Sequence, residues 1–112
     1  MPPATIETVS LNVPAAVARG TTYTVPGHKT IHGASFQVRG TFAQTFTLDV
    51  SMDGSAWVTA LDFQGGTLAA ITVAVADVLS GNWPFLSVNV TVNTSGLAIV
   101  ELAPQPAYGW SI

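Results

Sequence analysis

The sequence has no cysteine, so it offers neither a disulfide framework nor a thiolate for catalysis or metal binding. Positive charge is also scarce, because Arg19, Lys29 and Arg39 are the only fixed cations. A nucleic-acid-binding surface needs many groups that neutralise phosphates, and a basic membrane-binding patch needs a cluster of them. The sequence therefore predicts that neither nucleic acid nor a membrane surface is a partner.

Long apolar runs are missing as well, although hydrophobic residues make up 48% of the 112 positions. A membrane-spanning helix needs about 18 consecutive apolar residues. The longest candidate, residues 68–79, is shorter and is interrupted by Thr72 and Asp77. The first ten residues lack the basic start and apolar centre of a signal peptide. We therefore expect no membrane span and no signal peptide.

Charged residues of both signs make up only 8% of the chain, against roughly 25% in typical soluble proteins. A free monomer with so few charges is poorly protected against self-association. One explanation is that other subunits cover much of the surface. Another is a surface of Thr, Ser, Asn and Gln, which is polar without charge. The two explanations are compatible with each other.

The pattern that is present is an alternation of apolar and polar residues, which is typical of strands with one buried and one solvated face. Phe46, Leu48 and Val50, for example, alternate with threonine and aspartate. Turn residues such as Asp53-Gly54 separate the runs. About eight short strands are predicted, near residues 5–13, 21–25, 30–39, 44–52, 56–63, 69–76, 85–93 and 97–103. This pattern indicates a single all-β domain, an antiparallel sandwich or barrel.

One segment, "TLAAITVAVADVL", is ambiguous because its many alanines also suit a helix. The β-branched residues Ile71, Val73 and Val75 occupy every second position, which favours a strand.

The C-terminal residues 104–112 differ from the rest of the chain. Pro104 and Pro106 argue against a central strand there, because proline lacks a backbone N–H. We therefore expect a sandwich domain over residues 1–103 and an extended arm over 104–112. The arm either folds back on its own sandwich or docks on a neighbouring subunit through its large apolar residues, which are Tyr108, Trp110 and Ile112.

Asp49, Ser51 and Asp53 have the spacing of the first half of a calcium loop. Such a loop needs a bidentate glutamate at its twelfth position, and here that position is Ala60. The three residues are therefore predicted to line the solvent face of a strand that ends in a turn. No metal site is expected at this stretch.

His28 and His32 have a metal spacing only on a helix, and the glycines and proline beside them disfavour a helix. We therefore expect two separate histidines and no zinc. The six carboxylates fall mostly at predicted turns and strand ends, and no nucleophile elbow or phosphate loop is present. The sequence predicts no enzyme and no cofactor.

The stretch "FTLDVSMDGSAWVTA" resembles the strand–turn–strand hairpin of discoidin-like and other carbohydrate-binding jelly rolls, which many small bacteriophage virion proteins share. The later "WPFLSVNVTVNTSG" is similar to the strand that follows in those proteins, although Ser87 stands where discoidin-like domains usually carry an arginine. As a whole, the chain resembles a bacteriophage capsid decoration, or cement, protein of jelly-roll type.

That resemblance implies a jelly-roll-like β-sandwich that forms a dimer or trimer on the capsid surface of a virion. Its function would be to bind the major capsid protein and stabilise the shell, through interface residues that we expect to include Ile6, Tyr108, Trp110 and Ile112. The alternative is a carbohydrate-binding module of a phage tail or spike. In that case Trp57 and Trp83 would stack on a sugar ring, whereas in a purely structural role Trp57 would cap the core.

Overall fold

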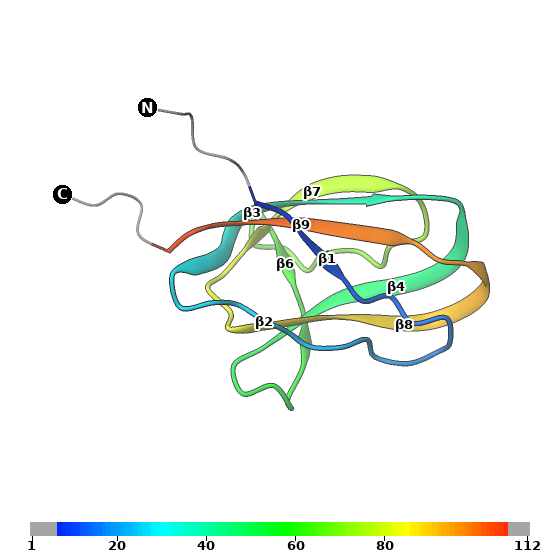
Figure 1. Ribbon diagram of the computed structural model, residues 1–112, viewed down its shortest axis with the longest axis horizontal. Coiled ribbons are helices and arrows are strands. Elements are labelled where there is room, and N and C mark those ends of the chain that lie inside the picture. The colour runs from blue at the N-terminus through cyan, green and yellow to red at the C-terminus, as the bar shows by residue number, and fades with distance from the viewer. Residues whose placement is uncertain (1–6, 108–112) are drawn as a thin grey trace.

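The computed structural model describes residues 7–107, and they form two antiparallel sheets and no helix (Figure 1). The expected all-β fold is thereby confirmed. Since the described residues contain no helix, none of them forms a membrane-spanning helix. The nine strands are β1 (Val9–Leu11), β2 (Tyr23–Thr24), β3 (Lys29–Arg39), β4 (Phe42–Ser51), β5 (Val58–Thr59), β6 (Leu61–Asp62), β7 (Val75–Ser80), β8 (Phe85–Gly96) and β9 (Ile99–Pro106).

The strand pairing is that of a jelly roll. One sheet has the order β1-β9-β3-β7-β6 and the other the order β2-β8-β4-β5. Strand β1 pairs with β9, β2 with β8, β3 with β7 and β4 with β5, so the pairs nest within one another along the chain. A long hairpin that is rolled up into two facing sheets has this nesting. The jelly-roll-like sandwich expected from the sequence is confirmed, with β6 as a short additional edge strand.

The core lies between the two sheets, and the alternation seen in the sequence fills it. In the central parts of the long strands, every second residue points inward and is almost completely buried. The inward residues include Phe36 and Val38 of β3, Phe46 and Leu48 of β4, and Val88 and Val90 of β8.

The alanine-rich segment differs from the expectation of a strand over 69–76. Strand β7 begins only at Val75, and the residues before it form isolated contacts. Ile71 exchanges two backbone hydrogen bonds with Phe46, at 2.8 and 3.1 Å, and its side chain is buried beside Leu68 in the core. The segment thus leaves the edge of one sheet before the chain joins the other sheet as β7.

The expectation that the prolines exclude a central strand is wrong, since β9 lies between β1 and β3 and continues through Pro106. The N–H group of Ala107 donates to the carbonyl of His28 beside β3. Because the backbone nitrogens of successive residues in a strand point to opposite sides, those of Pro104 and Pro106 point away from β3. Strand β1 pairs with β9 only as far as Leu102, so both prolines lie beyond it and displace no hydrogen bond. Only the end of the expected arm, residues 108–112, lies outside the described part of the chain.

Candidate functional site

The outer face of the β2-β8-β4-β5 sheet carries a buried polar cluster. Asp49 of β4 lies directly opposite Ser87 of β8, and these residues are only 5% and 1% exposed. Ser51, two residues further along β4, is also buried. The prediction that Asp49 and Ser51 line a solvent face is therefore wrong, because other parts of the chain cover this face.

Part of that cover is the segment 18–20, which extends the sheet beside β8. Gly20 donates its N–H to the carbonyl of Val88 at 2.7 Å, and Val90 donates to the carbonyl of Ala18 at 2.9 Å. A side chain at position 20 has no room, because a Cβ there would lie 2.2 Å from the backbone oxygen of Asn12. The segment can thus pass this close to Asn12 only with glycine at this position.

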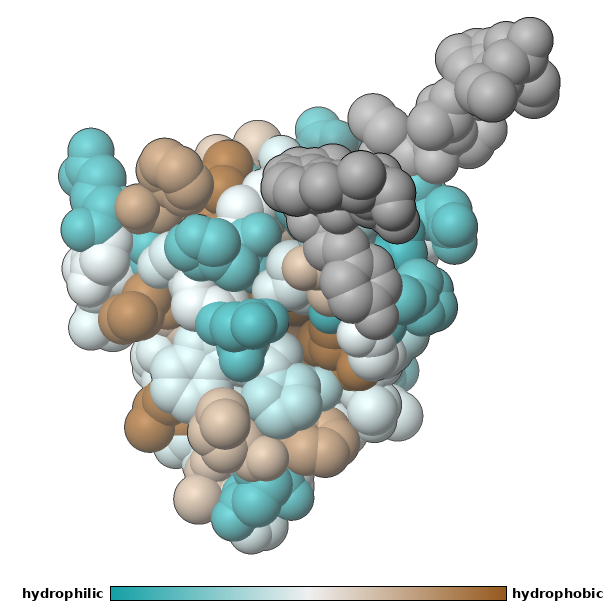
Figure 2. All heavy atoms as spheres, turned by 90° about the vertical axis from the view of Figure 1, so that its left-hand side faces the viewer, coloured by the Kyte–Doolittle hydropathy of each residue, from teal (hydrophilic) through white to brown (hydrophobic). Residues whose placement is uncertain are grey.

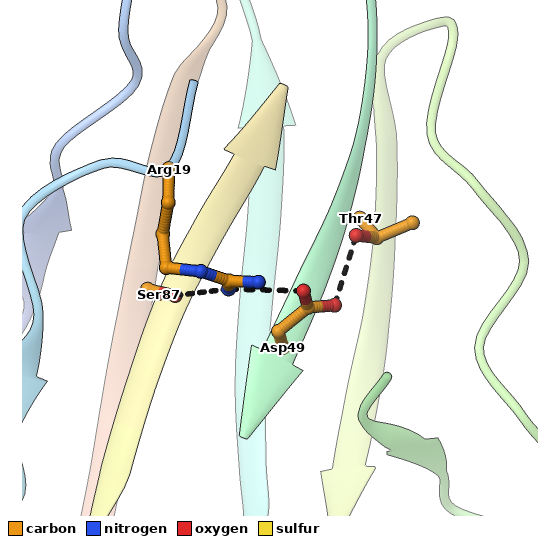
Figure 3. A network of polar contacts seen from close by, with 4 residues as sticks. All are labelled: Arg19, Thr47, Asp49 and Ser87. Carbon is orange, nitrogen blue, oxygen red and sulfur yellow. Dashed lines mark hydrogen bonds and ion pairs between the residues drawn. The ribbon is translucent and has the colours of Figure 1, made fainter. Parts of the chain in front are cut away.

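This pairing places Arg19 in register with Asn89 and aims its side chain across the sheet (Figure 3). One guanidinium nitrogen, Nη1, donates to Ser87 Oγ at 2.8 Å and lies 3.0 Å from Asp49 Oδ2. The hydroxyl of Thr47 donates to the other carboxylate oxygen, Oδ1, at 2.8 Å. We call these four residues, Arg19, Thr47, Asp49 and Ser87, the Arg19 cluster. Both oxygens of the buried carboxylate have partners in it, as burial of a charge requires.

Trp57, a candidate for sugar stacking, also contacts this cluster. The guanidinium carbon of Arg19 lies 4.6 Å from the centre of the Trp57 ring, within the range of a cation–π contact. Trp57 is half-buried and does not belong to the core residues or to those packed against them. One face of its ring is therefore occupied by an arginine of the same chain.

Trp83 lies in different surroundings, and the pocket that it lines does not include Trp57. Trp83 packs against the core and lines a pocket of about 290 Å³, together with Lys29, Met52 and Asn82. Its indole N–H is buried without a hydrogen-bond partner among the described residues. The end of the sandwich that carries the β2–β3 turn is shown in Figure 2, where hydrophobic patches are separated by polar ones.

Large hydrophobic side chains are exposed at nine described positions. Four of them lie on β8, on β9, in the turn between these strands or just before the segment that pairs with β8. Val92 lies opposite Thr45, Ile99 lies opposite Arg39, and Leu97 is in the turn itself. Val17 precedes the segment that pairs with β8. We call these four residues, Val17, Val92, Leu97 and Ile99, the apolar end; they are between 39% and 65% exposed. The expected interface residues Ile6, Tyr108, Trp110 and Ile112 all lie outside the described part of the chain.

Asp53 forms the turn that the sequence predicts at Asp53-Gly54. Its carboxylate oxygen Oδ1 accepts the backbone N–H groups of Ala56 at 2.9 Å and Ser55 at 2.8 Å, and the hydroxyl of Ser51 also donates to it. These hydrogen bonds, those from the backbone first, favour the ionised form and lower the pKa of Asp53 to about 2. The carboxylate thus has a structural role in the turn.

The two histidines form separate hydrogen bonds. His32 accepts the N–H of Gly81 on its Nδ1 at 2.9 Å, and the backbone carbonyl of His28 accepts the N–H of Ala107. Within residues 7–107, no group of three or more His, Cys, Asp or Glu residues is placed to hold a metal ion.

No known protein family, curated protein or solved structure matches this chain. Its function must therefore be inferred from its own residues.

Proposed function

We propose that this chain is a structural virion protein, a capsid decoration protein that binds and stabilises a shell through subunit contacts. The observation that carries the proposal is the apolar end, four large hydrophobic side chains that are exposed on or beside the β8–β9 hairpin of a chain with 8% charged residues. Exposed apolar groups that gather at one place are typical of surfaces that bind other proteins.

Binding would be driven by the burial of this apolar area, which stabilises a contact by about 25 cal/mol per Å² before the costs of association. Arg39, which lies opposite Ile99 of the apolar end, is paired with Glu101 at 2.9 Å between Nε and Oε1, so this neighbour brings little net charge into an interface. Many copies on one shell would add their weak contacts through avidity. The partner is the major capsid protein, and the chain itself is a dimer or trimer.

The experiment is co-sedimentation of the purified protein with capsids assembled from the major capsid protein of the same genome. We expect the wild type to bind and the variant Leu97→Asp to bind at least about tenfold more weakly, a loss of roughly 1.4 kcal/mol. The matched control is Phe63→Asp, because Phe63 is also exposed, at 64%, but follows β6 rather than β8. Wild-type protein that does not bind capsids would refute the proposal.

The second candidate is a carbohydrate-binding module, and the pocket beside Trp83 favours it. Lys29 and Asn82 line this pocket with the indole, so polar groups converge on an aromatic wall. A glycan array probed with the wild type and with Asn82→Ala tests it, since Asn82 is exposed and its replacement leaves the core contacts of Trp83 intact. A glycan that binds only the wild type would favour this second function.

A further inference from the structure

Strand β7 has a free edge. It pairs with β3 over Val75–Val78, and on its other side it pairs with β6 only at Leu79 and Ser80. Residues 75–78 therefore have a neighbouring strand on one side only. Unpaired strand edges are sites where another polypeptide can add as a further strand.

The backbone groups on this free edge can be identified. Val78 donates its N–H to the carboxylate Oδ1 of its neighbour Asp77 at 2.8 Å, so this N–H points away from β3. Because residues two apart in a strand direct their backbone groups to the same side, the N–H and C=O of Ala76 also point away from β3, toward the free edge. Outside the strand ladders, Ala76 has no backbone hydrogen bond to any residue of the described range.

A pocket of about 290 Å³ lies along this edge. The segment 67–73, which runs beside β7 before turning into it, forms the opposite wall (Figure 1). Phe36, Leu68 and Ile71 give the pocket an apolar floor from the core, and the exposed Val73 and Val75 border it. The pocket can therefore receive an apolar side chain from a strand that pairs with β7.

The pocket is also acidic. Asp62 and Asp77 line it, and no lysine, arginine or histidine does so within the described residues. The carboxylates of Asp62 and Asp77 accept hydrogen bonds only from backbone N–H groups of the described residues, and neither carboxylate has an ion pair within residues 7–107. A positively charged ligand could therefore bind to two carboxylates, neither of which is paired with a cation of the described residues.

We propose that an extended segment of another protein, with an apolar and a basic residue two positions apart and hence on the same face of a strand, adds as a strand to β7 at this edge. An apolar side chain of the segment enters the pocket, and a Lys or Arg side chain binds Asp62 and Asp77. This inference rests on the proposed function, because it describes how the partner is contacted. The ends of a second copy do not fit, since residues 1–6 and 108–112 contain no Lys or Arg.

The test uses the labelled peptide acetyl-TKTVTKTV-amide, whose lysines and valines share one face of a strand, and the ¹H–¹⁵N amide spectrum of the full chain. We expect the peptide to shift the amide signals of Ala76 and Val78, and a peptide with Glu in place of Lys to leave them unchanged. The variant Asp77→Asn should weaken binding by about fivefold, because its side chain still accepts the N–H of Val78 but lacks the charge. The matched control is Glu101→Gln, which removes a carboxylate from the outer face of the same sheet.

Several results would overturn the inference: no shift at Ala76, equal binding of both peptides, or equal binding by Asp77→Asn and the wild type. Self-association of Asp77→Asn without peptide binding to the wild type would also overturn it, because Asp77 would then only protect the edge from pairing. Capsid co-sedimentation separates the two proposals. Capsids that bind the wild type and Asp77→Asn equally refute the β7 contact and leave the proposed function standing, whereas peptide binding without capsid binding refutes the proposed function.

Discussion

Two aspartates of the sandwich, Asp49 in β4 and Asp77 in β7, belong to two contrasting regions. Beside Asp49, the segment 18–20 closes the edge of β8, and Arg19 compensates the buried carboxylate. Beside Asp77, the edge of β7 is open, and the carboxylate accepts one hydrogen bond, from the N–H of the next residue. The same side chain thus stabilises the fold where it is buried and is available to a partner where it is exposed.

The difference follows from the cost of desolvation. A carboxylate that is 5% exposed has lost its water and must find a cation and hydrogen-bond donors within the chain. An exposed carboxylate keeps its water and needs no partner for the fold to be stable. We therefore expect substitutions at the closed edge to change stability, and substitutions at the open edge to change binding.

The largest expected effect is that of Arg19→Met, which leaves Asp49 buried without a cation. Breaking a buried ion pair costs 3–5 kcal/mol when both partners are fully buried. The Arg19 side chain is 31% exposed, so we expect a loss of about 2 kcal/mol, measured by urea unfolding.

Its control is Arg39→Met, which breaks the exposed pair with Glu101. That pair is as short, at 2.9 Å, but its side chains are 52% and 32% exposed. Exposed pairs contribute roughly 0–1 kcal/mol, so the loss should be well below that of Arg19→Met. Equal losses in the two variants would show that burial does not distinguish the two ion pairs.

A smaller effect is expected for Ser87→Ala, which removes one acceptor of the Arg19 guanidinium. Ser87 is 1% exposed and lies opposite Asp49, so water cannot readily replace its hydroxyl. We expect a loss of about 1 kcal/mol in urea unfolding, the typical contribution of one hydrogen bond. Ser35→Ala, at an exposed position of β3, is the matched control and should change stability by less than about 0.5 kcal/mol. A Ser87→Ala variant as stable as the wild type would mean that the Arg19 cluster does not depend on this contact.

The contrast between the two edges also marks the limit of what the sequence predicts. Alternation of apolar and polar residues predicted the three longest strands to within a few residues, because burial of one face determines it directly. The same alternation wrongly predicted that the Asp49 side chain is exposed to solvent. It could not show that Arg19, thirty positions earlier in the chain, reaches across the sheet to cover that face, because this contact depends on how the strands are ordered.

The ends of strands were harder to predict for a related reason. Pro104 and Pro106 are tolerated in β9 only because β1 ends before them, and the free edge of β7 exists only because β6 is short. Each of these facts concerns the neighbouring strand rather than the residues themselves. Local composition therefore predicts the inward face of a strand well, and its edges poorly.

The smallest effect concerns Asp53, an exposed aspartate whose partners are two backbone N–H groups and a hydroxyl rather than a cation. Because its pKa is lowered from 3.8 to about 2, its stabilising contribution is complete above pH 4 and is lost as the pH falls toward 2. The difference in Tm between the wild type and Asp53→Asn should therefore be largest near pH 5 and shrink at pH 2. Added salt should leave this pH dependence almost unchanged, because hydrogen bonds rather than distant charges lower the pKa. A pH dependence that salt abolishes would mean that Asp53, like Asp49, relies on a cation.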